Sequence, residues 1–348
     1  MTLIHNFDAL DMIPFDDYDI GILDRPNMPS FRYLVGEAIR GELDLSFSGV
    51  LNSIIQLIFS EFTASTHLLR QLLIIAILSA LISCLTEAFS YKSAGDLGFY
   101  VTFIMAMLLA ISSFHLSVEV LNSVVSLVSN IMLAAVPLMV AVMAASGNIA
   151  GAASFHPLMF FALQLITRFI SLVYVPLVLA SAGLDFANHL SDTIRLDKFA
   201  ELLRKIAEWT LKGIVAVFAL LLTLQRFSAP ILSNVALRTT QSAVGAIPVV
   251  GSALNAAVDT VVHFGQAARS GVLVAMVLVL CVTLATPLLK LFVLSFIYRI
   301  TAGVIQPVAD KRLVKCMDIT AKHMSQLFYA AAIIGVMCVY TVVILLSF

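Results

Sequence analysis

Residues 120–167 contain no Asp, Glu, Lys or Arg, and this uncharged run restricts the possible folds more than any other feature of the chain. A helix needs about 20 mainly apolar residues to cross a bilayer, so the run is long enough for two spanning helices. The small-residue stretch 144–151 offers a break between them. Across the whole chain 61% of residues are hydrophobic and 12% are charged, whereas soluble domains are about 25% charged. The sequence therefore predicts an all-α, polytopic helical membrane protein and excludes a soluble enzyme, a disordered chain and a nucleic-acid binder.

Seven stretches have the length and composition of a spanning helix, and they fill a membrane domain over residues 68–348. Arg168 interrupts the fourth stretch, and an Arg at the centre of a span costs about 2.5–3.5 kcal/mol on insertion scales. A double crossing by residues 148–184 would give eight spans, but one half would then be short for a straight helix. We therefore favour seven. They lie near residues 71–90, 97–118, 122–145, 157–183, 210–229, 271–298 and 324–347.

Charge is distributed unevenly along the chain. Up to Glu61 there are ten acidic residues and three Arg, and residues 1–67 are predicted to be an acidic N-terminal segment with an amphipathic helix. Ten of the twenty Lys and Arg lie in residues 192–212 and 299–323. We call these segments the basic seams, and the positive-inside rule places both in the cytoplasm. The residues predicted to face a partner there are Arg195, Lys198, Arg204, Lys205, Lys311, Arg312 and Lys315.

Two segments between the predicted spans have helical patterns of their own. Residues 192–212 place apolar side chains on one face and charged side chains on the other, which predicts a helix lying on the membrane surface. Residues 230–270 are rich in Gly, Ala and Ser and predict an amphipathic or re-entrant hairpin. Such a hairpin is tolerated at membrane depth only where protein or water covers it.

The chain has no signature of catalysis or of metal binding. There is no GxxxxGK[ST], HExxH or GxSxG, and the four cysteines form no CxxC pair, so we predict no enzyme activity, cofactor or metal. Ionisable residues at membrane depth are costly and are functional candidates for that reason. Ion pairs that fix helix packing, or side chains that extend to the interface, are the alternative explanation, which is the favoured one for Glu87, Lys290 and the histidines, whereas Arg168 suits both. The candidates are Glu87, Arg168, Lys290, His115 and His156.

Helix-breaking residues define a second set of candidates. Prolines and close glycines inside apolar helices are frequent in transporters, whose sites lie at unwound segments. Any conducted path is predicted to be lined by residues 144–157, Arg168 and residues 236–263. The predicted breaks are at Pro137, Gly147, Gly151, Pro157, Pro176 and Pro287.

An ordered set of short segments resembles one known family, that of stage III sporulation protein AE. The similarity runs from about Leu51 to the end of the chain. Two departures are the absence of an apolar signal-like segment at the start and Ala309 in place of a usual Gly. The segments are Ser113-Phe114-His115, Ser129-Asn130, Pro137-Leu138, Ala145-Ser146-Gly147, Phe155-His156-Pro157-Leu158, Ala236-Leu237-Arg238-Thr239, Pro248-Val249-Val250-Gly251, Asp259-Thr260-Val261, and Gln306-Pro307 with Asp310.

The resemblance implies a role in spore formation. Members of that family are multi-pass components of a secretion-like channel complex between mother cell and forespore, in the mother-cell membrane around the forespore. It also implies partners, namely other sporulation membrane proteins and a cytoplasmic secretion-type ATPase, with no nucleic acid. The expectation is a non-enzymatic, permease-like export platform. The alternative is a stand-alone secondary transporter of a small solute, suggested by Arg168 and the proline-broken helices.

Overall fold

The computed structural model describes residues 47–89, 92–145, 160–190, 196–244, 251–307 and 309–347. Side chains are described mainly within 59–82, 98–133, 160–188, 196–223, 276–307 and 309–344. All secondary structure in these ranges is helical. The elements are α2 (Phe47–Phe89), α3 (Lys92–Ala145), a helical stretch over 160–169, the π-helix η3 (Ile170–Tyr174), α5 (Val175–Leu190), α6 (Asp197–Val244), α7 (Gly251–Ile305) and α8 (Lys311–Ser347).

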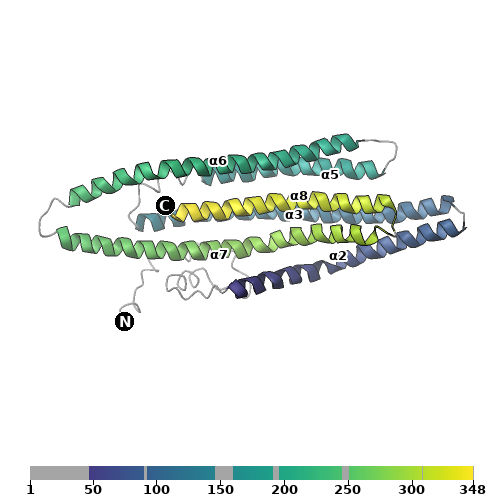
Figure 1. The fold of residues 1–348 in the computed structure, drawn as a ribbon, viewed down its shortest axis with the longest axis horizontal. Coiled ribbons are helices and arrows are strands. Elements are labelled where there is room, and N and C mark those ends of the chain that lie inside the picture. The colour runs from purple at the N-terminus through teal and green to yellow at the C-terminus, as the bar shows by residue number, and fades with distance from the viewer. Residues whose placement is uncertain are drawn as a thin grey trace.

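The helices lie side by side along one long axis (Figure 1). The end of α2 and the start of α3 lie toward one end of the bundle, and so do the corresponding ends of the pairs α5–α6 and α7–α8. We call this the turn end. The last residues of α6 and the first residues of α7 lie at the opposite end, as does the end of α8. Successive helices therefore run up and down the bundle, as expected of a protein that crosses a membrane repeatedly.

Within the described residues, six helices are long and apolar enough to cross a membrane. This supports a multi-pass helical protein, but the predicted count of seven or eight spans is not confirmed. The six segments are Phe59–Ile82, Gly98–Leu133, Phe160–Asn188, Asp197–Thr223, Met276–Ile305 and Lys311–Ile344.

The difference in count arises at α3. The sequence predicts separate spans at 97–118 and 122–145, whereas the structure has one helix of 54 residues. Helical hydrogen bonding continues through Glu119 because the opposite face is packed: Leu121, Val124 and Val128 are fully buried in the core. The predicted break at 144–151 lies largely outside the described residues.

Helices α6 and α7 are also longer than the spans predicted for them, because each is continuous with a neighbouring predicted segment. The amphipathic segment 192–212 is predicted to lie on the membrane surface, but from Asp197 it is continuous with the following span and runs along α5. The predicted hairpin 230–270 becomes the far ends of α6 and α7, and residues 245–250 lie outside the described part. At 1.5 Å per residue, the 55 residues of α7 extend about 82 Å, well beyond a hydrocarbon core of about 30 Å.

Prolines change helix geometry without ending the helices. The backbone N–H of Val175 donates to the Ile170 carbonyl, a π-type bond placed directly before Pro176. Because Pro176 has no N–H to donate, a local π-turn lets the chain continue as helix. Helix α7 runs through Pro287 and α3 through Pro137. Proline is tolerated in membrane helices because neighbouring groups satisfy the freed carbonyl.

Helices α2 and α3 are in close contact at Gly98. A Cβ atom built on Gly98 would lie 2.8 Å from Cγ2 of Ile82, inside the distance that real Cβ atoms keep. Since Ile82 is β-branched and stiff at χ1, it has little room to move. Gly98→Val is therefore expected to lower thermal stability by the equivalent of about 1–3 kcal/mol, as overpacking does.

Thermal unfolding of the purified protein in detergent, followed by size-exclusion chromatography, measures this effect. Gly213→Val is the matched control, because a Cβ at Gly213 meets no heavy atom within 4 Å. Equal midpoints for the two variants would contradict the close approach of α2 and α3.

Candidate functional site

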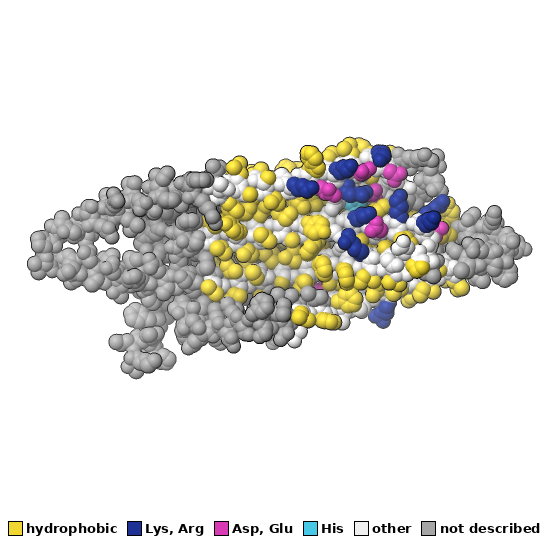
Figure 2. Space-filling model, in the orientation of Figure 1, with side chains coloured by type: hydrophobic (Ala, Val, Ile, Leu, Met, Phe, Trp, Pro, Cys, Tyr) yellow, Lys and Arg dark blue, Asp and Glu magenta, His cyan; other side chains and the backbone are white. Residues whose placement is uncertain are grey.

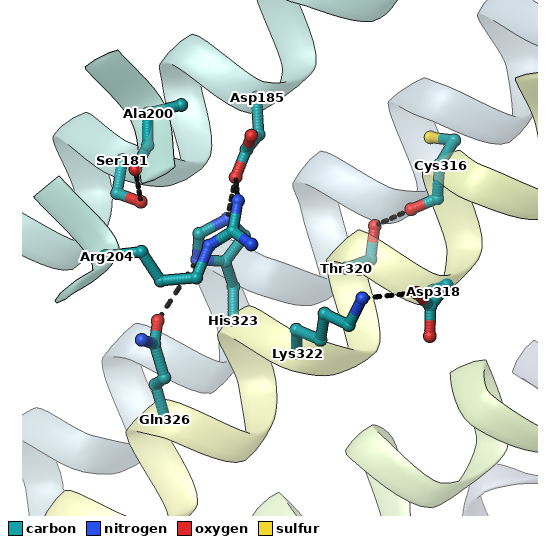
Figure 3. A network of polar contacts seen from close by, with 10 residues as sticks. All are labelled: Ser181, Asp185, Ala200, Arg204, Cys316, Asp318, Thr320, Lys322, His323 and Gln326. Carbon is teal, nitrogen blue, oxygen red and sulfur yellow. Dashed lines mark hydrogen bonds and ion pairs between the residues drawn. The ribbon is translucent and has the colours of Figure 1, made fainter. Parts of the chain in front are cut away.

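A buried cluster of polar side chains joins three helices near the turn end. It contains Asp185 of α5, Arg204 of α6, and His323 and Gln326 of α8, and Figure 3 shows these side chains converging. His323 is 0% exposed and Asp185 4%, so neither is hydrated to any useful extent. A buried charge is tolerated only when it is paired and hydrogen-bonded. We call these four residues the polar cluster.

Asp185 is the centre of the cluster. Its Oδ2 lies 2.6 Å from Nη2 of Arg204 and 2.8 Å from Nε2 of His323. Both nitrogens donate to the carboxylate, so His323 Nε2 carries a proton. One carboxylate thus connects α6 to α8, although Asp185 and His323 are 138 positions apart.

Gln326 continues the network on α8. Its Oε1 lies 3.3 Å from His323 Nδ1, and its backbone carbonyl accepts a 3.0 Å hydrogen bond from the hydroxyl of Tyr174 in η3. Two buried donors, Arg204 Nε and Gln326 Nε2, have no partner among the described residues. The network therefore retains capacity for a further acceptor, such as a water molecule.

Local packing explains why these side chains meet. The Ser181 hydroxyl donates to the Ala200 carbonyl at 3.4 Å, which joins α5 and α6 next to the cluster. Ala200 and Ala207 are fully buried, and their small side chains let the two helices lie close together. The ring of Phe114 on α3 packs edge-on against His323, with centroids 6.0 Å apart, and shields it from the other side.

A second polar layer lies between α7 and its neighbours. The hydroxyl of Tyr298 donates to the Leu109 carbonyl at 3.0 Å and lies 2.9 Å from Ser113 Oγ. The hydroxyls of Ser295 and Ser325 are 2.6 Å apart. Because each group is buried and paired, these contacts set the relative heights of α3, α7 and α8.

Exposed charges gather around the polar cluster at the surface. Figure 2 shows Lys, Arg, Asp and Glu on the turn-end part of the visible face, beside a broad hydrophobic band. Lys198 and Lys205 lie 3.5 and 3.0 Å from the carboxylate of Glu201, and Lys322 lies 2.7 Å from Asp318. The polar cluster thus lies where the charged end of the bundle meets the apolar band.

Comparison with known proteins identifies the family. The family model described as stage III sporulation protein AE matches residues 30–348. The chain belongs to the stage III sporulation protein AE family. It is 27% identical over 312 residues to the stage III sporulation protein AE of Bacillus subtilis (strain 168), covering 89% of this chain and 78% of that protein. No solved structure matches the chain.

In this family member, the predicted intramembrane residues whose side chains the structure describes, Arg168, Lys290 and His115, do not come together. Arg168 is exposed and lies about 26 Å along the helix from Asp185, toward the opposite end. Lys290 is half-buried on α7. His115 is exposed on α3, with Nε2 3.3 Å from Glu119. Glu87 belongs to α2, but its side chain lies outside the described residues.

The predicted partner-facing residues divide into two groups. Lys198, Lys205, Lys311, Arg312 and Lys315 are exposed, as a docking surface requires. Arg204 differs, because its side chain turns inward and is 23% exposed. The buried carboxylate of Asp185 on α5, which also contacts His323, holds the guanidinium inward through a charge-assisted hydrogen bond. Among the other predicted residues, His156, Gly147, Gly151, Pro157 and Arg195 lie outside the described residues.

Sequence analysis missed Asp185, His323 and Gln326. Asp185 has a sequence signal, since it is an acidic residue in a helix that remains apolar from 169 to 188. The predicted span ended at 183, two residues before Asp185, and so did not include it. Among the described residues, no three His, Cys, Asp or Glu side chains lie close enough together to hold a metal ion.

Proposed function

We propose that this protein is a non-enzymatic, permease-like membrane platform of a secretion-like complex that connects mother cell and forespore during sporulation. One observation carries the proposal: the family model for stage III sporulation protein AE covers residues 30–348, which include every apolar helix described above. The proposed location is the mother-cell membrane that surrounds the forespore. The proposed companions are other sporulation membrane proteins.

The charged turn end is the proposed cytoplasmic side. Exposed lysines at the beginnings of α6 and α8 gather there, and Lys and Arg are enriched in cytoplasmic loops. In this orientation, Lys198, Lys205, Lys311 and Lys315 present a surface to a soluble partner. A cytoplasmic secretion-type ATPase is the proposed occupant, because it would supply energy that a chain without a P-loop does not draw from nucleotide itself.

Deleting the gene tests the role. Sporulating cells are expected to complete engulfment and then stop, with loss of nearly all heat-resistant spores and unchanged vegetative growth. Complementation with the wild-type gene should restore spore counts, and an affinity-tagged copy should co-purify with other sporulation membrane proteins. Normal spore counts from a clean deletion would rule the proposal out.

A further inference from the structure

Contacts between helices show which residues of different helices lie at the same height along the long axis of the bundle. Phe114 of α3 packs against His323 of α8, and His323 is joined through Asp185 to Arg204 of α6. These residues therefore lie at one height, which we call the cluster level. The approach of Gly98 to Ile82 aligns α2 with α3, and Tyr298 with Ser113 aligns α7.

Beyond the cluster level, away from the turn end, four elements expose apolar side chains. They are η3, α6, α7 and α8, and together they form the hydrophobic band. Large apolar side chains that point outward on a membrane protein are suited to lipid. Examples are Leu172 (66% exposed), Leu220 (59%), Phe292 (41%) and Val336 (67%).

Helix α3, in contrast, exposes polar side chains at the same height. From 115 to 130 its outward side chains are polar and recur at helical spacing for about 22 Å, most of the thickness of a hydrocarbon core of about 30 Å. The core residues Leu121, Val124 and Val128 lie on the other face, so the polar side chains point directly away from the bundle. The next exposed residue beyond them is apolar, Leu133. The exposed polar residues are His115, Glu119, Asn122, Ser123, Ser126 and Asn130.

Helix α2 is mixed at this height. Ser60, Thr63 and His67 are exposed at or beyond the cluster level, but Phe59 (66%) and Ile55 (42%) are exposed there as well. Toward the turn end the outward residues of both helices become apolar, for example Ile77 on α2 and Leu108 on α3. Helix α3 is therefore polar outward from 115 to 130, at the height where α8 and the part of α6 from Val215 onward expose apolar side chains, and it is apolar outward where α6 and α8 are charged.

At this height, the hydrocarbon core of a bilayer cannot suit both the polar outward face of α3 and the apolar outward faces of the other helices. Polar side chains in hydrocarbon lack hydrogen-bond partners, at a cost of several kcal/mol for each unsatisfied group. If the apolar faces of α6 and α8 contact lipid, the outward face of α3 requires a polar environment. Asn, Ser and an exposed His115–Glu119 pair are groups that water satisfies well.

We propose that the polar outward face of α3 lines a water-filled path across the membrane. This proposal rests on the proposed membrane-platform function and assigns the class of cargo, namely hydrophilic solutes or chains. The remaining wall of the path must come from other chains, because this chain leaves the polar face of α3 on its outside. The path differs from the predicted one at residues 144–157, Arg168 and residues 236–263.

Cysteine accessibility in membranes of sporulating cells tests the path. The four native cysteines are replaced by alanine, and single cysteines are introduced as Asn122→Cys, Ser126→Cys or Asn130→Cys. A charged, membrane-impermeant methanethiosulfonate reagent is applied, because thiols react as thiolates and ionise only where water reaches them. Labelling is expected to be about 100-fold faster than at Val217→Cys or Val336→Cys, which are matched outward positions at the same height.

Three outcomes would overturn the path. If Ser126→Cys were labelled as slowly as Val217→Cys, water would not reach this face of α3. Rapid labelling of Val217→Cys and Val336→Cys would place this height outside the bilayer. Intermolecular disulfides at Ser126→Cys without labelling would show a dry contact between polar helices. The deletion phenotype is scored separately, so the path and the sporulation role can fail independently of one another.

Discussion

Asp185→Ala is expected to destabilise the protein by about 3–5 kcal/mol, the usual cost of removing one partner from a buried charge pair. The substitution leaves Arg204 and the fully buried His323 without the carboxylate that both contact, at 2.6 and 2.8 Å. It also disconnects α5 and α6 from α8. We expect a large fall in the thermal midpoint of the detergent-purified protein and a loss of spores, both measurable in the same strain.

A second substitution separates charge pairing from simple loss of volume. In the double variant Asp185→Leu with Arg204→Met, both charges are removed and the apolar replacements fill the space. Such replacements of buried pairs are often neutral or stabilising, so a substantial part of the lost stability should return. Glu201→Ala, which disrupts exposed pairs with Lys198 and Lys205, is the control and should leave the midpoint close to wild type. Equal effects of Asp185→Ala and Glu201→Ala would refute a buried cluster.

Tyr298→Ala is expected to have the second large effect, about 3–5 kcal/mol, as for other large aromatic side chains removed from a core. Tyr298 is fully buried, and its hydroxyl reaches both Leu109 and Ser113 on α3. The alanine variant leaves a cavity between α3 and α7 and unpaired polar groups on its wall. Thermal denaturation in detergent measures the loss.

Tyr298→Phe separates the contribution of the hydroxyl group from that of the aromatic ring. The ring remains and only the hydroxyl is lost, so we expect about 1 kcal/mol, typical of a single hydrogen bond. Tyr329→Ala removes an aromatic side chain that is 54% exposed and provides the matched control. If Tyr298→Phe were as damaging as Tyr298→Ala, the hydroxyl contacts and not the packing of the ring would hold α7 against α3.

Sequence composition was sufficient to predict an all-helical membrane protein, but helix boundaries were harder to predict. Each predicted span depended on an apolar run, and Glu119 appeared to end one. The structure keeps Glu119 inside α3 because a helix can place polar side chains outward while Leu121 and Val124 hold the inner face in the core. A composition window averages over both faces and does not separate them.

The polar cluster shows a different limit of sequence analysis. The rule that ionisable residues in apolar helices are functional candidates applies to Asp185, and a span extended by a few residues would have included it. Its partners could not be found in this way. His323 and Arg204 meet Asp185 only because α6 and α8 pack on α5, and pairing between distant segments depends on tertiary contacts that no local pattern records.

The unbroken length of α7 has a mechanical consequence. Gly251 and Ile305 are the ends of a single rod of about 82 Å, which continues through Pro287. A tilt of about 5° about one end displaces the other by about 7 Å, more than the rise of about 5.4 Å per helical turn. Because the helix is continuous, a tilt at one end moves the other end sideways without any local unfolding between them.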